Sequence, residues 1–341
     1  MAGHPAVDPG RCVHSRIETA SCQACVRVCP TRAWRLDDDG LSLDEAACDG
    51  CGLCAAACPT GAVGGLAYEP TRRRVAGREA LLAACDRIQP EPGEGRLPCL
   101  HGIGLMALLE AWRQGRRVWL VASGDCAACP RGGGERLEQR IDHLNGLFQA
   151  RGLALIHLRR LGAGGLAALL ATPNENRADT PPDGERRHWL GLFARNAAAG
   201  GSRQAPATPG AYFTGKGPLP WTLSLDPAAC VAFHACVRVC PTGALSRQDL
   251  AEPPHGGPDS LYCLDPARCT GCHLCRDVCE HDALYLAPWS RPAQDTVYLR
   301  AKLCPACGTR FHYPAARLHL PKQCWVCAGA KPAGRLYQVM E

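Results

Sequence analysis

One short run of cysteines constrains this chain more than any other feature of its sequence. The run reads Cys48-x2-Cys51-x2-Cys54-x3-Cys58 and is closed by Pro59. Three thiolates at this spacing wrap a loop around one cubane of iron and sulfide, and the fourth, held by the proline turn, points to a neighbouring cluster. A disulfide or zinc framework is the competing interpretation. The spacing therefore predicts that the chain binds metal clusters and holds electrons.

The run belongs to a unit that occurs twice. The same eight residues, Ala-Cys-Val-Arg-Val-Cys-Pro-Thr, stand at Ala24–Thr31 and again at Ala235–Thr242. Each copy is followed by a run of four cysteines, at Cys48–Cys58 and at Cys269–Cys279. A repeat of this kind predicts two copies of one module, each with two clusters.

The first copy resembles the bacterial two-[4Fe–4S] ferredoxin family over Arg11–Tyr68. In such proteins the fourth cysteine of each run serves the other cluster. One cluster then lacks a ligand, because Thr19 stands where the first cysteine of its run should be. We expect Cys12 to replace it across a short loop, and a free thiol is the alternative for Cys12. The resemblance implies one cluster on Cys29, Cys48, Cys51 and Cys54, and another on Cys12, Cys22, Cys25 and Cys58.

The second copy is less regular. The run Cys269–Cys279 has full spacing, although Glu280 replaces the proline. In the preceding run Phe233 replaces a cysteine, and a phenyl ring cannot bind iron. Three outcomes are open: a [3Fe–4S] cluster, substitution by His234 or Cys263, or an empty site. The expected ligands are Cys240, Cys269, Cys272 and Cys275 for the complete cluster, and Cys230, Cys236 and Cys279 for the incomplete one.

Between the two copies the pattern changes to alternating strands and helices. Apolar runs predict strands at Glu79–Cys85, Val118–Ala122 and Leu153–Leu158. Helical spacing of apolar residues predicts helices at Leu105–Arg113 and Glu135–Gln149. This alternation favours a parallel α/β sheet.

Four further cysteines lie in this central stretch. Cys85 and Cys126 each follow a predicted strand, and Cys99 and Cys129 each precede a helix or turn. The carboxyl ends of parallel strands meet at one edge of a sheet, so the four thiols can meet there. Helix N-termini at that edge favour the thiolate. A zinc site, or a redox disulfide between Cys126 and Cys129, is the alternative.

The same stretch resembles the iron–sulfur delta subunit of methyl-viologen-reducing hydrogenases over Leu81–Leu161. The resemblance rests on Leu-Pro-Cys99, on Gly124-Asp125-Cys126-x2-Cys129, and on a following helix with Arg136 and Arg140. It implies a [2Fe–2S] cluster, or a [4Fe–4S] cluster, and electron transfer between larger enzymes. Gly102-x-Gly104-x2-Ala107 also imitates a dinucleotide fingerprint, so NAD or flavin binding is a competing interpretation.

The C-terminal region carries two knuckles, Cys304-x2-Cys307 and Cys324-x2-Cys327. They resemble the zinc-ribbon family, in which four thiolates close a structural tetrahedral site. Rubredoxin-type iron uses the same ligands, and we favour zinc.

We therefore expect an α+β protein of several parts. With 341 residues, 24 cysteines and a net charge of +6, the chain is long enough for two or three domains. The expected boundaries are a dicluster module at 11–70, an α/β four-cysteine domain at 78–171, a linker at 172–221 with a short helix at 186–196, a second dicluster module at 222–290 and a zinc-ribbon unit at 298–341.

The residues outside the cysteine motifs restrict location and partners. Met1–Arg11 shows no signal peptide, and the longest apolar stretches are too short to span a bilayer. Thiolates built for metals need a reducing compartment, so we expect a cytoplasmic protein, unless a partner subunit carries it across a membrane. Arg72–Arg74 and Arg186–Arg187 lack interleaved aromatics, so we expect no nucleic acid as partner.

These patterns favour a polyferredoxin-like electron carrier that acts as a subunit or partner of a larger dehydrogenase, hydrogenase or reductase. Two alternatives remain from the sequence. One is an oxidoreductase with a cofactor or redox-active cysteines in the central domain. The other is an assembly or redox-sensing factor that uses iron–sulfur clusters and zinc.

Overall fold

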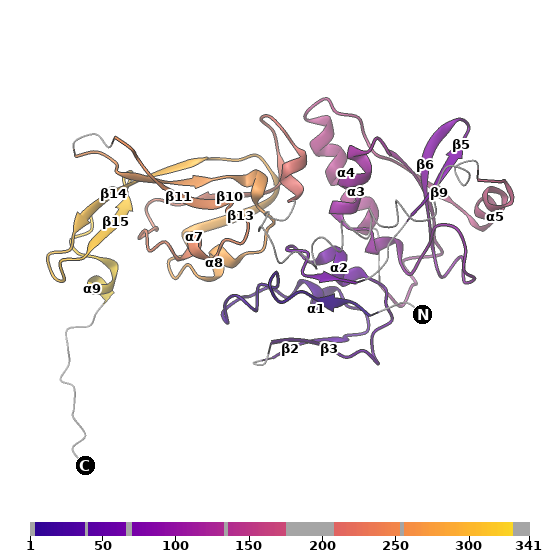
Figure 1. The fold of residues 1–341 in the computed structure, drawn as a ribbon, viewed down its shortest axis with the longest axis horizontal. Coiled ribbons are helices and arrows are strands. Elements are labelled where there is room, and N and C mark those ends of the chain that lie inside the picture. The colour runs from indigo at the N-terminus through magenta and orange to yellow at the C-terminus, as the bar shows by residue number, and fades with distance from the viewer. Residues whose placement is uncertain are drawn as a thin grey trace, which may run out of the picture.

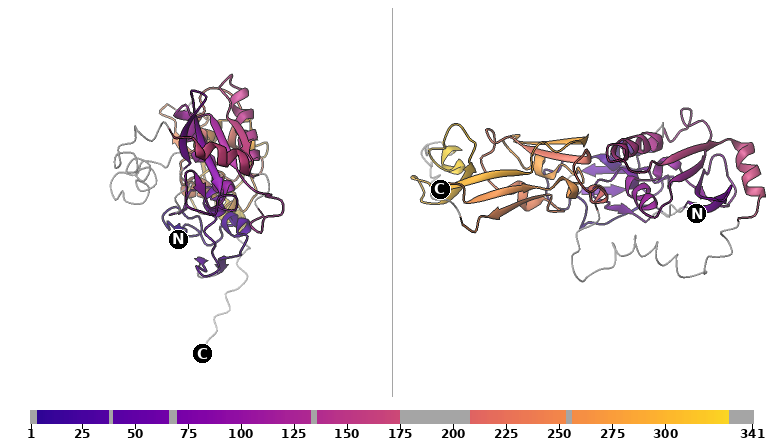
Figure 2. Two further views of the ribbon diagram at one scale, coloured as in Figure 1. Left: turned by 90° about the vertical axis from the view of Figure 1, so that its right-hand side faces the viewer. Right: turned by 90° about the horizontal axis from the view of Figure 1, so that it is seen from above.

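The computed structural model describes residues 4–37, 40–65, 70–132, 136–174, 208–252 and 256–329. The molecule is elongated, with the central sheet at one end and helix α9 at the other (Figures 1 and 2). Among the described residues, no helix has the length and apolar character needed to cross a bilayer.

The first module is built from short elements around its cysteine loops. Helices α1 (Ala24–Val28) and α2 (Leu53–Ala57) pack against each other. Helix α2 starts after Gly52, whose φ of 72° is a left-handed conformation that glycine adopts without strain. Two antiparallel pairs complete the module: β1 (Ala6–Val7) with β4 (Val63–Gly64), and β2 (Trp34–Asp37) with β3 (Gly40–Leu43).

The central domain contains a mostly parallel sheet, as the sequence predicts. Its path is β5-β6-β8-β9, and β7 pairs with β6. All pairs are parallel except the outer pair β5–β6. The strands are β5 (Thr71–Val75), β6 (Arg78–Cys85), β7 (Arg96–Leu97), β8 (Val118–Ala122) and β9 (His157–Leu161).

The third predicted strand, Leu153–Leu158, is displaced. Leu153 and Leu155 pack against the core from a loop, and β9 begins only at His157. Asn145 pins this loop, because its side chain exchanges hydrogen bonds of 2.9 and 2.8 Å with the backbone of Ile156. The apolar pattern therefore marked burial here and not strand pairing.

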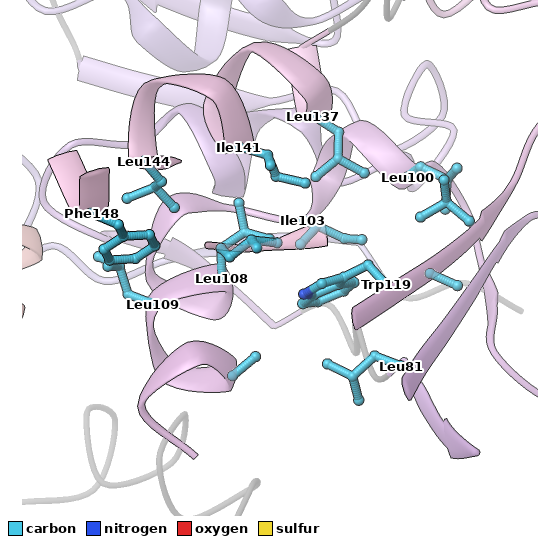
Figure 3. Packing of buried hydrophobic residues seen from close by; sticks show 14 of the residues in the cluster. Leu81, Leu100, Ile103, Leu108, Leu109, Trp119, Leu137, Ile141, Leu144 and Phe148 are labelled. Atoms are coloured by element: carbon cyan, nitrogen blue, oxygen red, sulfur yellow. The ribbon is translucent and has the colours of Figure 1, made fainter. Parts of the chain in front are cut away.

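Both faces of the central sheet are covered by helices. Side chains that alternate along β6 and β8 point to opposite faces. On one face Leu81 and Trp119 meet α3 (Leu105–Arg113) and α4 (Arg136–Gln149), as Figure 3 shows. On the other face Leu82 and Leu120 meet α5 (Ala163–Ala171) through Leu166.

The expected linker 172–221 is wrong at its C-terminal end. Residues 175–207, including the helix expected at 186–196, lie outside the described residues. From Thr208 onward the chain is packed. The ring of Phe213 packs at a tilt against that of Phe148 in the central core, with centroids 5.6 Å apart, and the Tyr212 hydroxyl donates to Glu110 at 3.1 Å. These aromatic residues bury apolar area even though prolines and glycines surround them.

One sheet contains strands of both the second module and the C-terminal region. Its order is β11-β12-β14-β15, so the boundary expected at 298 cuts through β14. A separate antiparallel pair of strands, β10 with β13, also belongs to this module. The strands are β10 (Leu219–Leu225), β11 (Leu245–Asp249), β12 (Ser260–Leu264), β13 (Leu284–Ser290), β14 (Thr296–Leu303) and β15 (Arg310–Pro314), and the helices are α7 (Ala235–Val239), α8 (Leu274–Asp277) and α9 (Trp325–Gly329). Short 3-10 turns lie at Leu100–Gly102 (η1), Pro209–Tyr212 (η3) and Pro266–Arg268 (η4).

Candidate iron–sulfur and metal sites

All 24 cysteines lie within the described residues, and none of them is disulfide-bonded. The bond considered between Cys126 and Cys129 is therefore not formed in this structure. The thiols gather in separate groups that follow the expected ligand sets.

In the first module Cys22, Cys25 and Cys58 come together, and Cys12 joins them. Burial raises the pKa of Cys25 to about 12, and the thiols of Cys58 and Cys22 add to the rise. Burial also raises the pKa of Cys22, with contributions from Cys58 and Cys12. The upstream loop thus brings Cys12 to the group that Thr19 leaves incomplete. A thiol with such a pKa stays protonated at neutral pH until a metal takes it up as thiolate.

The second group of this module surrounds Cys54. Burial raises the pKa of Cys54, and the neighbouring thiols of Cys48 and Cys29 contribute. Burial raises the pKa of Cys51 to about 12. The backbone N–H of Cys51 donates to Asp49 at 3.1 Å, which fixes the loop between the two cysteines. The loop geometry therefore follows from a short Asx turn inside the motif.

Three of the cysteines that are expected to bind the other cluster of their module each accept the same kind of hydrogen bond. The backbone N–H four residues downstream donates to the sulfur in each case, and such bonds to sulfur adjust the potential of a bound cluster. The third of these turns keeps this geometry although Glu280 replaces proline. The N···Sγ distances are 3.3 Å for Ala33 to Cys29, 3.2 Å for Ala62 to Cys58 and 3.4 Å for Ala283 to Cys279.

The complete group of the second module lies around Cys275. Burial raises the pKa of Cys275, and the thiols of Cys269, Cys272 and Cys240 add to the rise. Burial also raises the pKa of Cys269 to about 12, with Cys272 and Cys240 again contributing. The four expected ligands of this cluster are thus neighbours in space.

The incomplete group has three thiols and an aromatic cover. Burial raises the pKa of Cys236 to about 12, and Cys230 and Cys279 contribute. These three cysteines line a cavity that Phe233 and Trp325 also line. The rings of Phe233 and Trp325 meet edge to face, with centroids 4.3 Å apart. Trp325 comes from α9, so the C-terminal region closes a site of the second module, which sequence reasoning missed.

Of the two expected substitutes for Phe233, His234 lines this cavity and Cys263 does not. Both ring nitrogens of His234 are engaged, with Nδ1 at 2.6 Å from the Tyr262 hydroxyl and Nε2 at 3.2 Å from His312 Nδ1. Cys263 follows Tyr262 in strand β12, and successive side chains of a strand point to opposite faces. Tyr262 packs with the cluster cysteines, so Cys263 points away from them. The ring of His234 is therefore engaged in other hydrogen bonds beside the cavity, while Cys263 faces away from it.

The four central cysteines line one cavity, as the sequence predicts. Cys85 ends strand β6, and Cys126 follows strand β8 at the same edge of the sheet. Burial raises the pKa of Cys99 to about 11, with contributions from Cys85 and Cys126. Cys129 lines the same cavity. Convergence of parallel strand ends explains how cysteines far apart in sequence meet here.

Arg131 connects this cavity to the first module. Its Nε donates to Asp49 at 2.6 Å, and its Nη1 donates to Asp86 at 2.9 Å and to the carbonyl of Pro98. Although burial opposes its charge, these two carboxylates raise the pKa of Arg131. Asp49 stands inside the Cys48–Cys51 loop, so one guanidinium binds loops of two cysteine sites. In the sequence, only the position of Arg131 shortly after Cys129 pointed to a role at a cysteine site.

The glycines of the apparent nucleotide motif lie between Cys99 and the start of helix α3. A Cβ atom at Gly104 would lie 3.4 Å from the Cα atom of Ala56 in helix α2. This distance is an ordinary van der Waals contact, so the first module lies directly against the start of α3 at Gly104. Gly102 lies in the buried 3-10 turn after Cys99.

The C-terminal cysteines form the tightest group. The sulfur atoms of all four lie within 4.8 Å of one another, which among the described residues holds for this group alone. Cys307 and Cys324 are 3.8 Å apart, about the S···S separation of tetrahedral zinc with 2.3 Å bonds. The N–H of Cys324 donates to Cys304 at 3.3 Å and lowers the pKa of Cys304 to about 6. This arrangement of four sulfur atoms could hold a single metal ion. The four are Cys304, Cys307, Cys324 and Cys327.

Comparison with known families supports iron–sulfur binding in part of each of the two modules. A 4Fe-4S dicluster domain model matches residues 20–62, and a 4Fe-4S binding domain model matches residues 262–285. The chain therefore contains two ferredoxin-type iron–sulfur regions, the kind of domain that carries electrons. Cys12 lies upstream of the first matched range.

Two curated proteins show partial similarity. Hydrogenase-4 component A of Escherichia coli is 32% identical over 108 residues, which cover 32% of this chain and 47% of that protein. The isethionate sulfite-lyase activating enzyme of Oleidesulfovibrio alaskensis is 42% identical over 69 residues, 20% of each chain. This chain thus spans about half the length of the first relative and a fifth of the second.

Proposed function

We propose that this protein is an electron-transfer subunit or dedicated partner of a larger redox enzyme. The proposed [4Fe–4S] ligand sets are Cys12, Cys22, Cys25 and Cys58; Cys29, Cys48, Cys51 and Cys54; and Cys240, Cys269, Cys272 and Cys275. The three thiols Cys230, Cys236 and Cys279 bind a [3Fe–4S] cluster, the central four bind a [2Fe–2S] cluster, and the C-terminal four bind zinc.

The observation that carries this proposal is that cysteine loops of neighbouring parts touch. Cys51 of the first module and Cys99 of the central domain belong to one buried apolar cluster, together with Leu53. The guanidinium of Arg131 ties the same two loops through Asp49. These contacts support a short separation between the central site and the Cys48 site.

A second contact joins the two modules. Ser21, beside Cys22, donates from its N–H and its hydroxyl to the carboxylate of Asp277, at 2.9 and 2.7 Å. Asp277 stands in α8, shortly after Cys275. This contact supports a short separation between the Cys22 site and the Cys275 site.

Together these contacts support a single series of sites. Its order is the central site, the Cys48 site, the Cys22 site, the Cys275 site and then the three-thiol site at Cys236. A bound iron–sulfur cluster takes up and releases single electrons, so sites in series define a path. The order differs from the sequence, in which the central domain stands between the two modules. A redox partner would therefore meet the path at either end.

The class of partner follows from similarity and stays within this proposal. A hydrogenase component is among the relatives, so a hydrogenase, dehydrogenase or reductase is the partner that we propose. Free thiols intended for metals also favour a reducing compartment such as the cytoplasm.

Metal analysis of anaerobically purified protein tests the site assignment. We expect about 16–20 iron atoms and one zinc ion per chain, with matching sulfide. Fewer than about eight iron atoms would contradict the two-module assignment. A stoichiometric flavin or nicotinamide would favour the oxidoreductase alternative.

Paramagnetic resonance of the reduced protein tests the order of sites. Replacing Cys54→Ser removes the nearest paramagnetic neighbour of the central site, so the signal of the central site should narrow and relax more slowly. The matched variant Cys272→Ser should leave that signal unchanged. Narrowing of this signal in both variants would show that the sites follow the sequence order, and narrowing in Cys272→Ser alone would contradict the proposed order.

A further inference from the structure

His101 sits in the wall of the central cysteine cavity with one ring nitrogen unpaired. The residue is 2% exposed and lines the cavity with Cys85, Cys99, Cys126 and Cys129. Its Nε2 atom is buried and has no hydrogen-bond partner. Buried polar groups in native proteins have hydrogen-bond partners as a rule. An unpaired nitrogen in the wall of this cavity therefore indicates a hydrogen-bond partner that the protein itself does not supply.

The position of the ring is fixed by its neighbours. His101 lies in the 3-10 turn Leu100–Gly102, directly after Cys99. Arg140 of helix α4 donates at 2.8 Å to the carbonyl of His101 and at 2.8 Å to that of Ile103. The first turn of α4 also reaches the ring, because the backbone N–H of Leu137 donates to Nδ1 at 3.2 Å. Helix α4 thus fixes both the backbone of His101, through Arg140, and its ring, through Leu137.

This last hydrogen bond decides which nitrogen carries the proton. A backbone N–H only donates, so Nδ1 must accept, and a neutral imidazole then carries its proton on Nε2. An imidazolium carries a proton on each nitrogen and could not accept at Nδ1, so this hydrogen bond also makes the ring neutral. Its Nε2 presents an N–H and no lone pair, which makes it a donor and not a metal ligand.

We propose that His101 donates a hydrogen bond from Nε2 to a sulfur atom of the cluster held by the central cysteines, and so raises the reduction potential of that cluster. The inference rests on the proposed central iron–sulfur site. A donor to sulfur stabilises the added negative charge of the reduced state, which makes reduction easier. His101 is accordingly a positioning and tuning residue, distinct from the four ligands.

Two variants distinguish the roles of the two ring nitrogens of His101. His101→Asn keeps an acceptor near Nδ1 for the Leu137 N–H but removes the donor toward the cavity. His101→Gln places an amide N–H near the Nε2 position but removes the acceptor. We expect His101→Asn to lower the potential of the central site in an EPR-monitored titration, and His101→Gln to stay close to the unmodified protein. Iron content should be the same in all three.

Several results would overturn the inference. Unchanged potential in His101→Asn, or equal shifts in both variants, would show that the ring acts only through packing. Loss of iron in His101→Asn, or strong nitrogen hyperfine coupling in the unmodified protein, would make His101 a ligand. Cys99→Ser provides the separate check: if it removes no iron and no EPR signal, the central site itself is wrong and the role of His101 falls with it.

Discussion

The two ferredoxin-type modules contain the same run of eight residues, and each lacks one expected cysteine. They differ in what occupies the position of that missing ligand. In the first module Thr19 replaces the cysteine, and the upstream loop brings Cys12 to the group. In the second module Phe233 replaces it, and no other thiol approaches among the described residues. Instead Trp325 covers the cavity from the C-terminal region. The comparison teaches that the position of a missing ligand can be filled by a cysteine from elsewhere in the chain or lined by aromatic side chains.

The replacement of Cys12 by alanine should have the largest effect. It leaves three thiolates at a site built for four, and we expect loss of about four iron atoms per chain. Iron analysis of anaerobic protein measures this. Ala20→Gly, close to the same loop, is the control. If only about one iron atom is lost and a three-iron signal appears, then the two modules are more alike than we infer.

The substitution Phe233→Cys should make the second module resemble the first. Position 233 lies in the cavity wall with the three cysteines, so the new thiolate can complete a cubane. We expect a gain of about one iron atom and disappearance of the three-iron EPR signal of the oxidised protein. Phe233→Leu should leave that signal in place. A persistent signal in Phe233→Cys would mean that the gap is not at this position.

The aromatic cover can be tested through Trp325→Ala. Removing the indole opens the three-thiol cavity to solvent, so the three-iron signal should decay faster in air while anaerobic iron content stays the same. The neighbouring Val326, which is 56% exposed, gives the matched control Val326→Ala. Equal decay in both variants would show that Trp325 does not shield the site.

The contact between the modules should contribute least to stability. Ser21→Ala removes the hydroxyl bond to Asp277 and keeps the backbone bond, and this contact is exposed. We expect the free energy of unfolding to fall by about 1 kcal/mol or less, measured by denaturant titration under argon. A larger loss would mean that this contact, and not packing, holds the two modules together.

Much of this architecture could be predicted from local patterns. Helix α3 and strand β8 have the predicted bounds, because apolar spacing reports directly which face is buried. The meeting of the central cysteines could be predicted because the carboxyl ends of parallel strands lie at one edge of a sheet. The displaced strand β9 and the packed segment after Thr208 were not predicted, because burial without strand pairing leaves the same apolar pattern.

The sequence by itself determined the kinds of site: cysteine spacing states how many thiolates a loop can offer, because that spacing is covalent. The tertiary structure alone decided how the sites are joined and finished. Arg131 spans two cysteine loops, Trp325 closes a distant cavity, and the ring of His101 is turned so that Nε2 is left unpaired. These contacts join residues far apart in the chain, so only the packing of its parts could bring them together.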